Sequence, residues 1–169
     1  MLFVMSSASA QMKIGFVNIE LVLFYMPESK TMNQELQTYQ QKLRENIVTK
    51  QRYAQSKLEE YQTLAQQNAP TDPKVLIALE TELMKLDEEI KATAAEADQK
   101  LIEKRQESLK PILEKVDANL TSLANEEGYD YILNAVDGNG VSIVLHGPQE
   151  HDLTEKIMNK LGIKIPAEN

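Results

Sequence analysis

The residues Asn68-Ala69-Pro70-Thr71-Asp72-Pro73 separate two long stretches of sequence, of which the first, 29–67, contains neither glycine nor proline. Two prolines within six residues indicate a turn, after which Asp72 can cap a helix and Pro73 suits the first helical turn. The flanking stretches, 29–67 and 74–127, favour helices far longer than the ~11–12 residues of an average helix. Gly128 then provides a natural helix stop. The sequence therefore predicts two long helices joined by a turn at 68–73.

Both predicted helices carry an apolar residue at every eleventh position. These positions are Leu36, Ile47 and Leu58 in the first helix and Leu79, Ile90, Leu101, Ile112 and Leu123 in the second. Further apolar residues fill the three- and four-residue steps between them. A period of 11 averages ~3.67 residues per turn, which keeps one apolar stripe on one face of a nearly straight helix. Two such stripes joined by a short turn predict an antiparallel helical hairpin.

Six apolar residues lie away from both stripes. They are Val48, Tyr53 and Leu64 in the first helix and Ile77, Met84 and Ile102 in the second. Two interpretations stay open, because these residues can either widen the contact between the helices or face solvent. In the second case they suit a binder that makes many weak apolar contacts without one fixed geometry. Pro111 lies inside the second helix, where it removes a backbone hydrogen bond, and we expect it to act as a hinge near the root of the hairpin.

The segments on either side of the hairpin predict a small α+β base. Residues 13–18, 129–136 and 141–145 favour strands, and Asp137-Gly138-Asn139-Gly140 predicts a hairpin turn between the last two. Asp152 is expected to cap a closing helix at 153–161. The base comprises 11–28 and 128–169, and the hairpin arm 29–127 is inserted between them. A three-stranded sheet with one helix buries little surface, so we expect bases to associate through Val141, Ile143 and Leu145.

The N-terminus has features of a secretory signal peptide. A short apolar run, Leu2-Phe3-Val4-Met5, precedes Ala8-Ser9-Ala10, which matches an A-x-A cleavage pattern. We interpret residues 1–10 as part of a signal peptide and Gln11 as the first mature residue. The run is shorter than usual and no basic residue precedes it, so a mildly apolar terminus is the alternative. Later residues contain no apolar stretch long enough for a membrane span, and we expect no stable membrane anchor.

The composition argues against several function classes. The 169 residues carry a net charge of −8, which disfavours nucleic acid as a partner. The absence of cysteine excludes disulfides and thiolate chemistry. We expect His146 and His151 to be exposed loop residues, because neither has partners at metal-ligand spacing. The glycine-rich turn lacks the Gly and Glu positions of a calcium-binding EF-hand. We predict no catalytic residues, no cofactor and no metal.

The order of these segments resembles the Skp/OmpH family of periplasmic chaperones. The resemblance rests on the strand Lys-Ile-Gly-Phe-Val-Asn at 13–18, the helical hairpin, Lys110-Pro111, and Asn125-Glu126-Glu127-Gly128-Tyr129-Asp130. The segment Leu23-Phe24-Tyr25-Met26-Pro27-Glu28 is similar to the branch found in Bacteroidetes-type bacteria. The resemblance implies a homotrimer whose bases form a β-barrel-like body. Its three arms would hold unfolded outer-membrane β-barrel proteins in the periplasm, without ATP, and prevent their aggregation.

The chain departs from that family in its charge. The best-known members are strongly basic, whereas 29–127 contains 14 basic and 18 acidic residues here. We therefore do not carry over the family's lipopolysaccharide binding to this chain. We expect apolar contacts to bind the client, an unfolded outer-membrane protein. Two alternatives remain: a coiled-coil structural spacer or envelope tether, and a cytosolic prefoldin-like cage if residues 1–10 are not a signal peptide.

Overall fold

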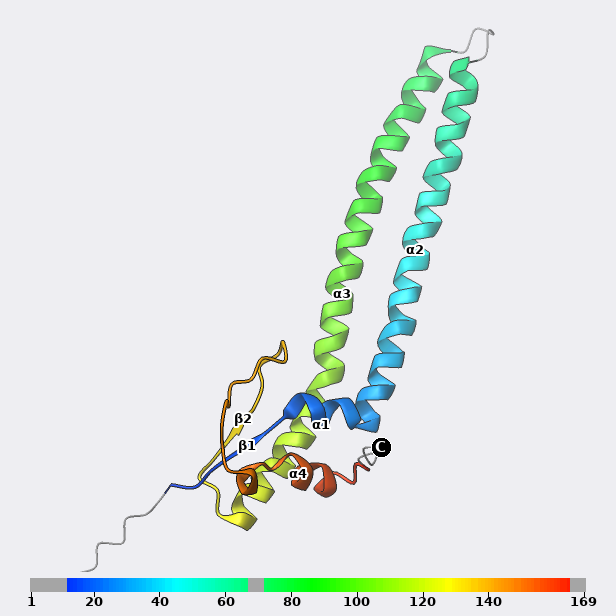
Figure 1. Ribbon diagram of the computed structural model, residues 1–169. Helices are drawn as coiled ribbons and strands as arrows, with labels where there is room; N and C mark the ends of the chain where they lie inside the picture. The colour runs from blue at the N-terminus through cyan, green and yellow to red at the C-terminus, as the bar shows by residue number, and fades with distance from the viewer. Residues whose placement is uncertain (1–11, 67–71, 165–169) are drawn as a thin grey trace, which may run out of the picture. The chain divides into compact units, whose positions relative to one another are not determined.

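The computed structural model describes residues 12–66 and 72–164. The predicted signal peptide at 1–10 and residues 68–71 of the predicted turn lie outside this range. The elements follow in the order β1 (Ile14–Val17), α1 (Ile19–Tyr25), α2 (Pro27–Gln66), α3 (Pro73–Glu127), β2 (Tyr131–Asn134), the 3-10 turn η1 (Gln149–His151) and α4 (Thr154–Lys160) (Figure 1). The protein is thus mostly helical, with two long helices and a small sheet, as the sequence predicted.

The chain divides into two compact units. The base unit contains residues 12–31 and 109–164, and the hairpin unit contains residues 32–66 and 72–108. Helices α2 and α3 contribute to both units, with unit boundaries after Thr31 and after Ser108. We describe each unit by itself.

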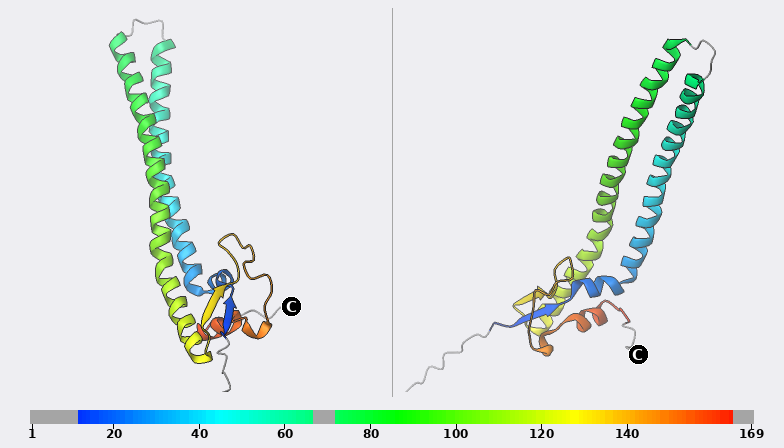
Figure 2. Two further views of the ribbon diagram at one scale, coloured as in Figure 1. Left: turned by 90° about the vertical axis from the view of Figure 1, so that its left-hand side faces the viewer. Right: turned by 45° about the horizontal axis from the view of Figure 1, so that its top comes forward.

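In the hairpin unit, α2 and α3 run side by side in opposite directions, as both views in Figure 2 show. The start of α3 follows the predicted capping, because the Asp72 carboxylate accepts a hydrogen bond from the Lys74 amide at 2.9 Å. The stripe of α3 is the better buried of the two: Leu79, Leu86 and Ala97 are buried. The stripe of α2 is only half-buried, and Leu58 is exposed. One thin seam therefore joins the two helices.

The base unit holds a conventional apolar core. Its most deeply buried side chains come from β1, α1, the residue between α1 and α2, the last part of α3 and the region of α4: Val17, Val22, Met26, Val116, Leu153, Ile157 and Met158. Strand β1 pairs in parallel with β2, with Ile14 opposite Tyr131. Gly15 packs closely against the start of α4, because a Cβ there would lie 2.9 Å from Leu153 Cδ1 and would force that side chain to shift. The N-cap residue of α4 is Leu153 and not the predicted Asp152, whose carboxylate instead accepts hydrogen bonds from the amide and hydroxyl of Thr154.

The predicted strand at 141–145 is wrong, and the sheet has two strands instead of three. The turn before it is correct, because the Asp137 carboxylate accepts hydrogen bonds from the amides of Asn139 and Val141. After one isolated bridge between Val136 and Ser142, however, the pairing stops. Val141, Ile143 and Leu145 are exposed and only Val144 is half-buried, so a continued ladder would gain little apolar burial.

Candidate binding surfaces

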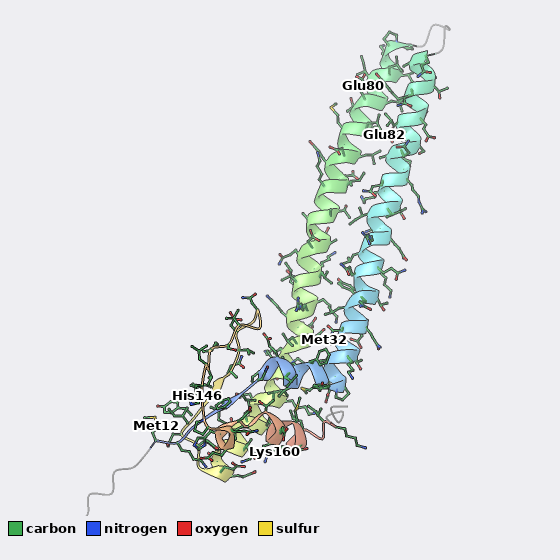
Figure 3. All side chains as sticks on the ribbon, viewed as in Figure 1. Met12, Met32, Glu80, Glu82, His146 and Lys160 are labelled. Carbon is green, nitrogen blue, oxygen red and sulfur yellow. The ribbon has the colours of Figure 1, made fainter. Side chains whose placement is uncertain are left out.

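Interhelical polar contacts hold the two helices of the hairpin unit together towards the start of α3. The Tyr61 hydroxyl donates to Glu80 at 2.6 Å, and the Tyr53 hydroxyl donates to Glu82 at 2.9 Å. Lys50 forms an ion pair with Glu89 at 3.2 Å. Glu80 and Glu82 are labelled in Figure 3. The hydrogen bonds to these carboxylates raise the pKa of both tyrosines, which therefore stay neutral donors at ordinary pH.

The six apolar residues away from the stripes fall into two groups. Ile77, Met84 and Ile102 are 61%, 64% and 52% exposed, and Tyr53 is 48% exposed. Val48 and Leu64 are half-buried. The three α3 residues are 7 and 18 positions apart, so the 3.6-residue helical turn places them on nearly the same side of α3. The hairpin unit thus presents a row of separated apolar side chains to solvent.

Two shallow hollows accompany this surface in the hairpin unit. The first, of about 320 Å³, lies between the helices and is lined by Gln51, Ala54, Gln55, Leu58, Leu83, Asp87 and Ile90. The second, of about 420 Å³, is lined by Gln37, Gln40, Gln41, Arg44, Glu45 and Val48 of α2. Mixed polar and apolar walls of this kind offer no dry pocket for a defined small molecule. The first hollow shows that the hairpin seam is incompletely filled.

The base unit has an exposed apolar surface of its own. Val141, Ile143 and Leu145 are 62%, 59% and 87% exposed. Further large apolar side chains are exposed on the sheet and on α1, and the sequence analysis did not single them out: Ile14, Tyr131, Leu133 and Phe24. For Phe24 a signal was present, because seven of the eight residues in 19–26 are apolar whereas only Val22 and Met26 are buried. A helix that is apolar all round usually has neighbours on every side.

Pro111 is an exposed residue inside α3, which continues through it to Glu127. The boundary between the two units falls at Ser108 and Leu109, one turn of helix before this proline. The residues after it belong to the core of the base unit, where Ile112 and Val116 are buried.

Across residues 12–66 and 72–164, no group of three or more His, Asp or Glu side chains could hold a metal ion. His146 is exposed, as predicted (Figure 3). The prediction for His151 is wrong, because it is half-buried with Nδ1 3.1 Å from the Tyr129 hydroxyl. Among the described helices, none combines the length and apolar character that crossing a membrane requires.

Comparisons with known proteins give matches that cover nearly the whole chain. A family model described as outer membrane protein (OmpH-like) matches residues 13–161. The chaperone protein Skp of Vibrio cholerae serotype O1 is 23% identical over 156 residues, which cover 92% of this chain and 87% of that protein. A crystal structure from Caulobacter crescentus CB15, titled as a putative OmpH-like outer membrane chaperone, superposes with a TM-score of 0.73. It is 9% identical and covers 95% of this chain and 90% of its own, so it shows a shared fold.

Proposed function

Since the chain belongs to the family of OmpH-like outer membrane proteins, we propose that it is a chaperone of the bacterial periplasm. In this proposal it binds unfolded outer-membrane β-barrel proteins and prevents their aggregation, without ATP and without catalysing a reaction. The similarity to the Skp chaperone of Vibrio cholerae supports the chaperone role.

The observation that carries the proposal is the exposed apolar row of the hairpin unit. Ile77, Met84 and Ile102 stand apart on one side of α3, each more than half exposed. Separated apolar contacts on a long, thin support do not define a shape, and they suit a partner that has none. An unfolded β-barrel protein offers alternating apolar side chains along each of its strand segments. Tyr53, Val48 and Leu64 would add contacts from α2.

Charge is not the proposed source of affinity. Residues 29–127 have 14 basic and 18 acidic side chains, so they lack the positive charge that would attract acidic clients or lipopolysaccharide. Exposed ion pairs contribute only ~0–1 kcal/mol each and are screened by salt. Apolar contacts contribute about 25 cal/mol per Å² and persist in salt.

The base unit is proposed to hold three copies together. Val141, Ile143 and Leu145 are exposed in the single chain and lie in a segment of strand-like sequence that forms only one isolated bridge. A neighbouring copy would supply both the partner and the apolar cover. Pro111 is proposed as the hinge between base and hairpin, and residues 1–10 as the signal for export.

Dilution of a urea-unfolded outer-membrane β-barrel protein into buffer tests the function. With the protein present, light scattering should stay near the baseline, and native mass spectrometry should show one client per oligomer of this chain. An unrelated acidic protein at the same concentration serves as the control and should leave aggregation unchanged. Equal scattering in both samples would contradict the proposal. Tight binding of one folded partner, without any effect on aggregation, would instead favour an envelope tether.

A further inference from the structure

The charge of the hairpin unit is unevenly distributed along its length. The Lys50–Glu89 ion pair divides the unit into two parts. Beyond it, residues 51–88 contain four basic and seven acidic side chains, a net charge of −3. The remaining part, 32–50 and 89–108, contains seven basic and seven acidic side chains and is neutral. The negative charge of the hairpin unit is thus confined to the part that includes the start of α3.

Met84 lies within that negative part and is surrounded by carboxylates on the helix surface. Residues three and four positions away are its neighbours on α3. For Met84 these are Glu80, Thr81, Asp87 and Glu88, and all four are exposed. Glu80 accepts a hydrogen bond from the Tyr61 hydroxyl, and Asp87 forms an exposed ion pair with Lys91 at 2.6 Å. These contacts leave oxygen atoms of all three carboxylates at the surface beside an apolar side chain that is 64% exposed.

Ile102 provides an internal comparison on the same side of the same helix. Its neighbours three and four positions away are Asp98, Gln99, Arg105 and Gln106, all exposed and together neutral. Ile102 and Met84 therefore offer similar apolar exposure in different electrostatic surroundings.

We propose that the Met84 surface, formed by Met84 with Glu80, Asp87 and Glu88, binds unfolded segments in which Lys or Arg stands next to an apolar residue. This inference rests on the proposed function and adds a sequence preference to it. The apolar residue packs on the flexible Met84 thioether, which adapts to different partners. The cationic side chain extends to the surrounding carboxylates. Complementary charge of this kind mainly determines which partner is chosen and how fast it binds.

Two other occupants fit the surface less well. A metal ion needs several carboxylates at one point, and the described part of the chain contains no group of three that could hold one. An anionic lipid surface would be repelled by the net charge of −3 in 51–88. A second copy of the chain remains as an outcome that the experiment must separate.

The test compares two short synthetic peptides that share the same apolar residues and differ only in having Lys or Glu between them. Fluorescence anisotropy at low ionic strength measures their affinity for the full chain. We expect the Lys peptide to bind about fivefold more tightly, as a few exposed ion pairs allow. The variant Glu80→Gln/Asp87→Asn/Glu88→Gln should bind both peptides equally. The control Glu96→Gln/Asp98→Asn/Glu103→Gln makes the same charge change on α3 and should keep the preference.

Equal binding of both peptides by the unmodified protein would overturn the inference. Equal loss of preference in both variants would also overturn it, since net charge alone would then explain the effect. A photoreactive phenylalanine analogue at position 84 should capture the Lys peptide more efficiently than the same analogue at position 102. Capture of a second copy of the chain at position 84 would show a self-interface instead. If the protein suppresses aggregation but shows no preference for the Lys peptide, only this inference is refuted. If it also fails to suppress aggregation, the proposed function is refuted as well.

Discussion

The base unit has a core of fully buried apolar residues, whereas the hairpin unit has only a thin apolar seam, although both units also expose apolar side chains. Val22, Leu153 and Ile157 of the base unit are 0% exposed. The best-buried stripe residue of the hairpin unit, Leu79, retains 6% exposure, and Leu58 of the facing stripe retains 37%. A thin seam opens at low cost, since few apolar contacts must break. The comparison teaches that stability is concentrated in one unit, which leaves the apolar residues of the other available for contact.

The strongest effect is expected for the exposed apolar residues of the base unit, which are proposed to form the interface between copies. Replacing Val141, Ile143 and Leu145 together by Ser should convert the proposed trimer into monomers, because apolar contacts contribute about 25 cal/mol per Å² buried. Native mass spectrometry measures the change, and circular dichroism should show unchanged helix content. The exposed residues Val75 and Leu113, replaced by Ser, form the control. A trimer that survives the triple substitution would place the interface elsewhere.

Removing buried volume should affect the two units unequally. Ile157→Ala in α4 should lower the free energy of unfolding by about 3–5 kcal/mol, because Ile157 is fully buried and leaves a cavity. Leu86→Ala in the hairpin unit should cost about 2 kcal/mol, since the half-open seam can collapse around it. Urea unfolding followed by circular dichroism measures both. Equal losses would mean that the hairpin unit contributes as much to stability as the base unit.

Pro111 tests whether the junction of the two units is a hinge. Pro111→Ala should stabilise the protein by up to about 3 kcal/mol, because proline is unfavourable by that amount inside a helix. Spin labels at Thr63 on each copy of the oligomer should then show a shifted or narrower distance distribution. Lys110→Ala, one residue away, is the control and should alter neither quantity much. An unchanged distribution would refute the hinge while leaving the chaperone function intact.

The smallest effect concerns the exposed apolar residues of the hairpin unit. Replacing Tyr53, Met84 and Ile102 together by Ser should weaken binding of an unfolded outer-membrane protein by about tenfold, or about 1.4 kcal/mol, since only weak apolar contacts are lost. Binding measured by fluorescence at low and moderately high salt should differ little, because a whole client carries both charges. Steep salt dependence combined with an unaffected triple variant would show that charge, and not apolar contact, holds the client.

The long helices were predictable because their signals are local. The breakers Pro70 and Pro73, the stop at Gly128 and the 11-residue stripes need no knowledge of the rest of the chain. The core of the base unit was harder to predict, since Met158 is buried although nothing in its local sequence pattern indicated this. Burial there depends on how α4 meets distant segments such as α1.

The sheet shows where sequence reasoning stopped. Residues 141–145 have the composition of a strand, and the turn at Asp137 was identified correctly from its glycines. Strand formation also requires a partner with unpaired backbone groups, which composition does not reveal. The six residues away from the stripes were identified by their spacing, but spacing alone did not distinguish exposed Met84 from half-buried Val48. That difference depends on the side chains of the facing helix.

The 11-residue stripes also limit how such a hairpin can change in length. Eleven residues make three turns of helix with only a small residual rotation, so losing eleven from each helix keeps both stripes facing each other. Losing one or two residues rotates the rest of a helix by ~100° per residue and turns its stripe away from its partner. Hairpins of this type should therefore lengthen and shorten during evolution in paired steps of about 16 Å, which sets a discrete series of sizes for whatever they enclose.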